Sequence, residues 1–363
     1  MKEDYTWEQL CVKIGVSYYV IKGLIDKQAI QFNHLIKILR YAKLKDMEIA
    51  DLIYEVRANG KNTRFTFKNS PEFSRFFGYL LAEGRLAKSS HIWFTNGDRE
   101  IVDDYVNLVR KLFNKEPLVA EYKPNCWDVI IYSEPLKKIL GKLGMASKTE
   151  RKEISNIILK HSGNEEIAHL LNGLYCGDGY VSHKAPVIEI TTKSEKLAKG
   201  IESCLLRLGI LFNKRDTQKG YGTFIGNYKS ITIYGVNNLQ LFNDKIKLIH
   251  KNKAKRILSH LYKKQNTNVD LIEVNGLVKE ISRDLSINIK KAKKDYPILD
   301  AYCYNQCTPS RNGLLLLTEK LFIGQSDDIK KLTTLVKSDV LWDELVEVEE
   351  IDGEEWVYDL SVD

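Results

Sequence analysis

Two acidic residues, Glu83 and Asp178, occupy the position before the last in two stretches of similar sequence that lie 95 residues apart. Phe76–Gly84 and Leu171–Gly179 each contain an apolar run with one internal glycine, and each ends in a small residue, an acid and a glycine. Such a run predicts a buried helix, and its final glycine is typical of a left-handed helix cap. Two carboxylates held together at helix C-termini repel each other and oppose the helix dipoles. A divalent cation offsets both effects, so the pair predicts a metal site.

The glycines inside the two stretches indicate how the helices meet. Gly78 and Gly173 each cost a helix about 1 kcal/mol relative to alanine, which favours a close approach of two backbones at these positions. If the helices pack through these glycines, Glu83 and Asp178 emerge side by side at the same end. The spacing of 95 residues is a reasonable length for one duplicated unit.

Both stretches resemble the signature of the LAGLIDADG homing endonucleases, in the single-chain form that carries two motifs. The resemblance implies a Mg²⁺-dependent DNA endonuclease in which Glu83 and Asp178 are the catalytic metal ligands. It adds the carbonyl oxygens of Ala82 and Gly177 as ligands, and it implies that Ca²⁺ binds without supporting cleavage. Such an enzyme cuts double-stranded DNA at a long asymmetric site, leaves short 3′ overhangs and acts as a monomer. A DNA-binding regulator without catalysis and an RNA-splicing maturase are the alternatives.

The elements that follow each motif repeat in the same order, which predicts a duplicated α+β protein. In the first repeat, residues 63–165, we expect a strand, a helix, two strands and a helix at 90–95, 98–113, 118–122, 127–132 and 135–143. In the second repeat, residues 166–265, we expect the same elements at 186–191, 194–208, 211–215, 230–234 and 238–246. The resemblance implies a pseudo-two-fold arrangement, in which two antiparallel sheets form a saddle over DNA around the central helix pair.

Lysine-bearing turns follow the last helix of each repeat. The resemblance places one active-site lysine in each turn, near the scissile phosphate, and we expect these to be Lys148 and Lys253. Three rivals share the same turns: Lys152, Lys251 and Lys255. Solvated turn lysines are the alternative for any one of them. The resemblance also implies a polar residue near the catalytic water at the end of the first strand of each repeat, at Asn96 and Thr192.

Alternate residues on the strands are expected to read the DNA major groove. The candidates share a polar or aromatic side chain on a predicted strand or beside one: His91, Trp93, Thr95, Lys184, Glu189, Thr191, Arg215, Lys229 and Ser230. Alternation alone does not decide which face of each strand meets DNA.

The charge distribution favours a nucleic-acid partner. The chain carries a formal net charge of +7, but eleven acids and no Lys or Arg follow Lys337, so residues 1–337 alone carry +18. Such an excess is typical of a polyanion binder. We find no run of 18 apolar residues and no signal-peptide pattern, and therefore expect an intracellular protein of the cytoplasm or nucleoid, with no membrane partner. That the cell is archaeal is implied only by the resemblance of the C-terminal segment described below. The six cysteines form no zinc-binding pattern, so we expect reduced thiols.

The regions outside the repeats are expected to be helical accessory domains. In residues 1–62, helices at 8–14 and 18–25 joined at Gly15 have helix-turn-helix spacing, with Tyr18, Tyr19 and Lys22 exposed. Further helices are expected at 33–42 and 47–57, then a polar linker at 59–63 and a short strand from residue 64. Residues 266–335 are expected to form a second basic, helix-turn-helix-like domain. An ordinary helical subdomain is the alternative for both regions.

The last segment, residues 336–363, is expected to form a β-hairpin that turns at Asp352 and Gly353. Val357–Leu360 resembles the start of the C-terminal splicing block of archaeal inteins, which implies an intein-derived endonuclease. The chain has neither the His-Asn pair that ends this block nor a leading nucleophile segment, so we expect it not to splice. An unrelated acidic hairpin is the alternative.

Overall fold

The computed structural model describes residues 6–27, 34, 37–38, 41–42, 55–58, 61–64, 69–87, 89–221, 224–263, 270–338 and 340–342. The chain divides into two compact units, Met1–Lys264 and Gln265–Asp363. Among the described residues, no helix is long and apolar enough to cross a membrane.

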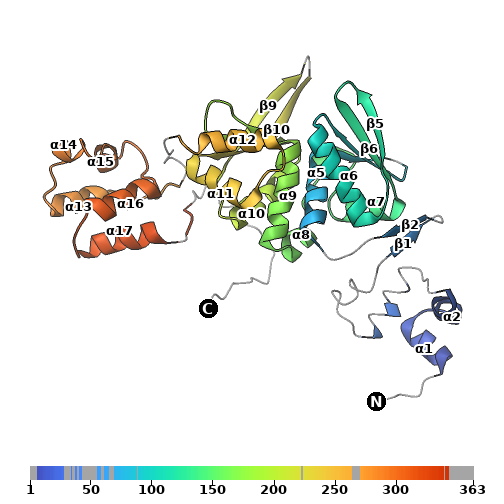
Figure 1. Ribbon diagram of the computed structural model, residues 1–363. Coiled ribbons are helices and arrows are strands. Elements are labelled where there is room, and N and C mark those ends of the chain that lie inside the picture. The colour runs from blue at the N-terminus through green and yellow to red at the C-terminus, as the bar shows by residue number, and fades with distance from the viewer. Residues whose placement is uncertain are drawn as a thin grey trace. The chain divides into compact units, whose positions relative to one another are not determined.

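Two helices that end in the acidic motifs lie side by side in the first unit (Figure 1). They are α5 (Pro71–Glu83) and α9 (Asn164–Gly177). A Cβ at Gly78 would collide with the carbonyl oxygen of Leu170, and a Cβ at Gly173 would collide with that of Arg75. The two internal glycines therefore let the helix backbones touch, which no larger residue would allow.

The first repeat contains a four-stranded antiparallel sheet beside α5. Its strand order is β3 (Gly84–Leu86), β4 (His91–Asn96), β6 (Cys126–Tyr132) and β5 (Leu118–Lys123). Helices α6 (Arg99–Phe113) and α7 (Glu134–Lys142) pack on one face of this sheet. The connection to α9 contains a short 3₁₀ helix and one more helix, η1 (Thr149–Arg151) and α8 (Asn156–His161).

The second repeat follows the same plan beside α9. Its sheet has the order β7 (Tyr180–Val181), β8 (Val187–Thr192), β10 (Phe224–Tyr234) and β9 (Asn213–Tyr221). Three helices accompany it: α10 (Glu195–Arg207), α11 (Val236–Ile246) and α12 (Lys251–His260). One continuous apolar core, built from α5, α9 and the helix-facing residues of both sheets, joins the two repeats.

The structure corrects four details of the repeats as predicted. Strands β3 and β7, directly after the motifs, were not expected, and 251–260 is a helix where a turn was expected. Strands β9 and β10 are longer than predicted because they extend together as a hairpin beyond the core. The final glycines of the motifs are not left-handed caps: Gly84 is extended at φ −90°, and Gly179 does not have a positive φ.

Those final glycines are instead required by close packing. A Cβ at Gly84 would lie 2.6 Å from the carbonyl oxygen of Leu80, and one at Gly179 would lie 2.5 Å from that of Tyr175. The chain therefore turns out of each helix directly into β3 or β7 with no room for a side chain.

The N-terminal region contains the two expected short helices, α1 (Trp7–Ile14) and α2 (Tyr18–Lys27). They meet at Gly15, which is left-handed at φ 73°. The end of the expected helix 47–57 and the linker after it are wrong, because β1 (Glu55–Ala58) pairs with β2 (Lys61–Arg64) as an antiparallel hairpin. The expected helix 33–42 lies mostly outside the described residues.

The second unit is helical in its described part. Its helices are α13 (Leu277–Asp284), α14 (Ile289–Ala292), α15 (Ile298–Cys303), α16 (Arg311–Lys320) and α17 (Asp327–Lys337). They share a separate apolar core. The expected C-terminal hairpin lies outside the described residues, apart from 336–338 and 340–342, so it stays a prediction. The helix-turn-helix role of both accessory regions also stays a prediction.

Candidate metal and nucleic-acid site

The two motif acids lie at the same end of the helix pair. Glu83 is the last residue of α5, and Asp178 follows α9 directly. Their backbones converge at Gly177, where a Cβ would lie 2.6 Å from the Cβ of Ala82 and 3.4 Å from the Cγ of Glu83. The small residues before the acids thus allow the two carboxylates to approach each other.

The surroundings disfavour the charged form of both carboxyl groups. Burial, and then the nearby charge of Asp178, raises the pKa of Glu83 to about 7. Burial also raises the pKa of Asp178, against the lowering effect of two nearby lysines, Lys152 and Lys253. Both residues remain exposed at the surface, so water and a cation can reach them. Two adjacent carboxylates with raised pKa values are suited to share a cation.

Lys152 is buried against the end of α5. Its side chain is only 3% exposed, and its Nζ donates hydrogen bonds to the carbonyl oxygens of Leu80, Leu81 and Ala82 at 3.3, 2.8 and 3.1 Å. Burial lowers the pKa of Lys152 to about 8, although Asp178 and Glu83 favour its charged form.

Lys253 makes the equivalent contacts at the end of α9. Its Nζ donates to the carbonyl oxygens of Tyr175, Cys176 and Gly177 at 3.0, 2.7 and 3.0 Å. Burial again lowers the pKa of this lysine. The two lysines therefore occupy matching positions in the two repeats, each bound to the last turn of its own motif helix.

The structure corrects the choice of lysine in the first repeat. Lys148 is exposed at the start of η1, whereas its predicted rival Lys152 contacts the helix end. In the second repeat Lys253 lies at the site, while Lys251 and Lys255 are exposed. Sequence offered no signal that separates Lys148 from Lys152, because both lie in the same polar turn. Only the path of the chain through η1 decides which side chain is buried.

The oxygen atoms at the helix ends fit a hard divalent cation. Among the described residues, no three His, Cys, Asp or Glu side chains gather into a metal-binding group, so the acids would act with backbone oxygens. The carbonyl oxygens of Ala82 and Gly177 already accept lysine hydrogen bonds, but a carbonyl has a second lone pair. Mg²⁺ typically binds one or two carboxylates and completes its shell with water and substrate phosphates. The residues present fit that pattern.

The two polar residues expected near the catalytic water each bind the backbone two positions further along the chain. Asn96 Oδ1 accepts a hydrogen bond from the Asp98 backbone at 2.7 Å, and Thr192 Oγ1 accepts one from the Ser194 backbone at 3.1 Å. Both side chains are buried on the helix-covered side of their sheets. They shape the turns that begin α6 and α10, and the expected role of both residues near the catalytic water stays a prediction.

The first sheet has an open face formed by three of the predicted DNA contacts. His91, Trp93 and Thr95 are partly exposed and alternate with buried residues along β4. The guanidinium of Arg85 lies 4.7 Å from the Trp93 ring centre. Arg85 was missed at the sequence level because β3 was not expected.

The open face of the second sheet contains four more of them. The register places Thr191 opposite Ser230 and Ser230 opposite Arg215, and Ser230 Oγ donates to Glu189 at 3.0 Å. Ser230 itself is fully buried, so the structure does not expose it for the direct DNA contact that was expected. Lys219, which was also missed, joins this face, because its Nζ lies 3.4 Å from Glu189 Oε1. Lys219 was missed because the expected strand ended at residue 215, whereas β9 continues to Tyr221.

Two predicted DNA contacts do not lie on these faces. Lys229 is opposite Thr192, on the helix-covered side, and forms ion pairs with Glu195 at 2.9 Å and Asp216 at 2.7 Å. Lys184 is exposed in the turn between β7 and β8, outside the strands. Lys229 was misplaced because its expected strand began near it, so the face could not be assigned.

The second repeat matches a family model. Residues 165–247, which span α9 to α11, match the model described as the LAGLIDADG-like domain. The resemblance to this family is therefore confirmed, and these residues form a LAGLIDADG-like domain. Because the first repeat has the same sheet order and the same helix-end geometry, the chain has the duplicated α+β LAGLIDADG fold.

Several curated proteins are similar to most of this chain. Glutamine–fructose-6-phosphate aminotransferase of Methanocaldococcus jannaschii is 23% identical over 364 residues, covering 98% of this chain and 31% of that protein. DNA-directed RNA polymerase subunit Rpo1C of the same organism is 29% identical, covering 85% and 35%. The replicative DNA helicase DnaB of Synechocystis sp. is 28% identical, covering 81% and 35%. The chain spans about a third of the length of these relatives.

Solved structures with some similarity include the homing endonuclease I-DmoI in complex with DNA and Ca, with a TM-score of 0.36 and 13% identity over 49% of this chain and 91% of that one. The N-terminal LAGLIDADG domain of DUF199/WhiA has a TM-score of 0.34 and 15% identity over 50% and 83%. At these values the fold assignment rests on the family model and on the geometry of the chain itself.

Proposed function

We propose that this chain is a divalent-metal-dependent DNA endonuclease that cuts both strands of one long, asymmetric site. The observation that carries the proposal is the paired end of α5 and α9, where two carboxylates with raised pKa values lie beside two lysines, one buried and one half-buried, that are bound to the helix-end carbonyl groups. A structural role alone does not explain this grouping, because crowding charged groups at helix ends is costly.

The acids and helix-end oxygens would hold Mg²⁺. When bound, the metal supplies an activated water and stabilises charge on the attacked phosphate and the leaving 3′ oxygen. Glu83 and Asp178 would provide its carboxylate ligands, each serving one DNA strand, with the carbonyl oxygens of Ala82 and Gly177 beside them. Ca²⁺ would occupy the same oxygens without supporting cleavage.

The lysines would act on the phosphates from fixed positions. Lys152 and Lys253 are held by three carbonyl oxygens each, so their ammonium groups need no reorganisation when a phosphate arrives. Preorganised positive charge of this kind stabilises the charge that develops on phosphate during cleavage.

The open sheet faces would contact the DNA. The residues on them combine aromatic, hydroxyl and cationic side chains, which can pair with base edges in the major groove. We include the following residues in this face: Arg85, His91, Trp93, Thr95, Glu189, Thr191, Arg215 and Lys219. The excess of positive charge before residue 338 supports a phosphate-rich partner. We also propose that the chain binds its DNA site as a monomer and that its cleavage leaves short 3′ overhangs.

Sequences similar to this chain occur within proteins of different function, as expected for an inserted sequence. Three functionally unrelated proteins, an aminotransferase, an RNA polymerase subunit and a helicase, each match it over about a third of their length. A segment common to such different proteins is best explained by insertion into each of them. This supports the intein-derived origin inferred from Val357–Leu360.

The two alternative functions predict different results in binding and cleavage assays. A DNA-binding regulator would bind tightly without cleaving in Mg²⁺, and a maturase would prefer structured RNA. Neither requires paired carboxylates beside lysines at the end of the helix pair, so the endonuclease is the better supported function.

The test is cleavage of genomic DNA that lacks the inserted sequence, with the full chain and Mg²⁺, reading the ends by sequencing. Recurrent ends at one long site are expected, with no cleavage in EDTA, in Ca²⁺ alone or with Asp178→Asn. Intact DNA despite tight, salt-sensitive binding would contradict the proposal and favour the regulator.

A further inference from the structure

The backbone segments that contain Lys152 and Lys253 are each tied to the opposite repeat. The carbonyl oxygen of Lys152 accepts a hydrogen bond from the hydroxyl of Ser194 at 2.5 Å, where α10 of the second repeat begins. The backbone N–H of Lys251, two residues before Lys253, donates to Glu100 Oε2 at 3.2 Å in the first turn of α6 of the first repeat. The two ties come from equivalent ends of equivalent helices.

Packing reinforces the tie at Lys152. A Cβ at Gly200 of α10 would lie 2.8 Å from the Cβ of Ile154, so the backbone of α10 lies directly against this segment. Ser194 is 1% exposed and Ile154 is 4% exposed. At the edge of the contact, Lys196 Nζ lies 3.3 Å from Glu153 Oε2. The segment that contains Lys152 is therefore seated on the second repeat.

Glu100 provides a hydrogen-bond acceptor for the first turn of helix α12, whose own N-cap side chain provides none. The N-cap residue of α12, His250, has no side-chain capping hydrogen bond, and the first N–H groups of a helix have no partner within the helix. Glu100 accepts one of them, and its other oxygen lies 2.8 Å from Lys251 Nζ. His250 Nε2 also lies 3.3 Å from Asp98 Oδ2 on the same repeat as Glu100.

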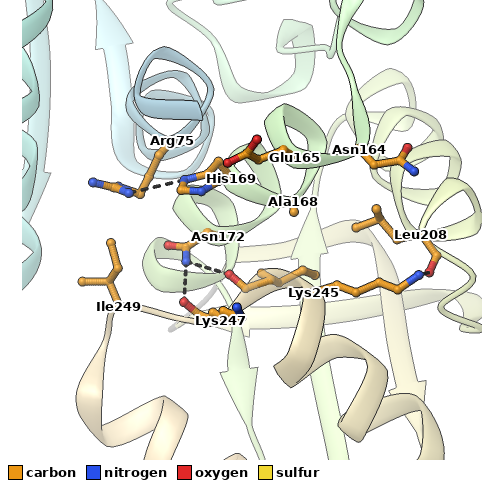
Figure 2. Close-up of a pocket in the computed structure, with 11 residues that line it drawn as sticks. Arg75, Asn164, Glu165, Ala168, His169, Asn172, Leu208, Lys245, Lys247 and Ile249 are labelled. Atoms are coloured by element: carbon orange, nitrogen blue, oxygen red, sulfur yellow. Dashed lines mark hydrogen bonds between the residues drawn. The ribbon is translucent and has the colours of Figure 1, made fainter. Parts of the chain in front are cut away.

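Each segment is held on its other side by its own repeat. Figure 2 shows Asn172 of α9 directed at the chain that leads into α12, where its Nδ2 donates to the carbonyl oxygens of Ile246 and Lys247 at 2.9 and 2.8 Å. In the first repeat, the Glu153 N–H donates to the Gly144 carbonyl at 2.9 Å. Each lysine segment thus lies between the two repeats.

We propose that Ser194 and Glu100 are positioning residues. Each binds the backbone of a lysine segment in the opposite repeat, and in this way fixes the position of a lysine side chain that it does not itself contact. Ser194 holds Lys152 against the end of α5, and Glu100 holds Lys253 against the end of α9. Each repeat thereby completes the site of the other. The effect on catalysis rests on the proposed endonuclease function, but the placement of the lysines does not.

The placement can be measured without DNA or metal, by reductive methylation of the full chain with formaldehyde and cyanoborohydride followed by peptide mass mapping. The loss of one hydrogen bond should raise the exposed fraction of the held lysine about fivefold. Ser194→Gly should therefore raise the methylation rate of Lys152 about fivefold and leave Lys253 unchanged. Glu100→Ala should do the reverse. Glycine is used at 194 because it remains an acceptable N-cap for α10.

Three controls are matched to these changes. Ser194→Thr keeps the hydroxyl and should keep Lys152 protected. Ser203→Ala removes a hydroxyl of the same helix that donates only to the Lys199 carbonyl, and Glu116→Ala removes an acid that pairs with Arg110 within the first repeat. Neither should change the reactivity of either lysine.

Gly200→Ala tests the segment that contains Lys152 in a second way. Its Cβ would displace Ile154 and should expose Lys152.

A crossed pattern, with one lysine released by each variant, supports the proposal. Equal release of both lysines in each variant would show general loosening and overturn it, as would unchanged protection in Ser194→Gly, Gly200→Ala and Glu100→Ala. A chain that binds DNA without cutting it would still show the crossed pattern, so failure of this inference and failure of the endonuclease proposal are distinguishable.

Discussion

Lys152 and Lys253 bind the last turns of two neighbouring helices in the same way, each donating to three consecutive carbonyl oxygens. A cation at a helix C-terminus interacts favourably with the helix dipole and with carbonyl groups that have no partner within the helix. The lysines therefore reduce the repulsion that Glu83 and Asp178 would otherwise meet there. The same contacts fix two ammonium groups beside the proposed metal ligands.

Replacing Lys152 should impair cleavage, whereas replacing Lys148 should not. Lys152→Met removes an ammonium group fixed beside the acids, and the loss of one such preorganised group costs about 10²–10³ in rate. Lys148→Met removes an exposed charge and should leave the rate within about twofold. Single-turnover cleavage of the mapped site measures the rates of both variants. Equal rates would contradict the choice of Lys152 over Lys148.

Breaking either tie between the repeats should bias cleavage toward one strand. Ser194→Gly should slow the same strand as Lys152→Met, and Glu100→Ala should slow the same strand as Lys253→Met, because each tie places one lysine. Strand-resolved nicking on a doubly labelled target measures this bias. A merely structural effect would slow both strands equally, and that result would contradict the prediction.

The metal-free chain should lose stability as the pH rises from about 4.5 to 7. The pKa of Glu83 is raised in the folded chain, so the folded chain binds more protons than the unfolded chain in this window and is penalised as the carboxyl group ionises. Urea denaturation at several pH values, with and without Mg²⁺, should show a decline that Mg²⁺ or Glu83→Gln reduces. A decline of the same size in Glu83→Gln would assign it to other groups.

Filling the contact between the motif helices should destabilise the fold. Gly173→Ala places a methyl group against the carbonyl oxygen of Arg75, and overpacking of this kind costs about 1–3 kcal/mol or more. Gly23→Ala in α2 is the matched control, because a Cβ there meets no atom within 4 Å. Alanine should be neutral or slightly stabilising at that helical position. Denaturant midpoints of the two variants compare them directly.

Two lysines on adjacent strands of one sheet should differ in their effect on DNA binding. Lys219 lies on the open face, and Lys219→Ala should weaken binding and reduce the salt dependence by about one unit of slope if it contacts a phosphate. Lys229 is paired with Glu195 and Asp216 on the helix-covered side, so Lys229→Ala should leave the slope unchanged. Binding titrations at several salt concentrations test both variants, and equal slopes would remove Lys219 from the interface.

Sequence alone determined the main plan of this protein. The repeated pattern of apolar residues, glycine and acid placed Glu83 and Asp178 at the ends of two helices, because helix periodicity and glycine packing are local properties. Most of the strand and helix order of both repeats followed from the same local signals, apart from β3, β7 and α12, and the predicted helices began at Asp98 and Ser194, which are the N-cap residues of α6 and α10. These features need no knowledge of distant contacts.

Tertiary structure decided which of several similar residues reach the site. Lys152 rather than Lys148 is buried against the last turn of α5, and Lys229 faces the helices because the register of β10 places it opposite Thr192. The final glycines serve close packing instead of a left-handed turn, which depends on the strands that follow. The ties from Ser194 and Glu100 join segments 42 and 151 residues apart. Contacts at such separations depend on how the two repeats pack, so no local pattern could predict them.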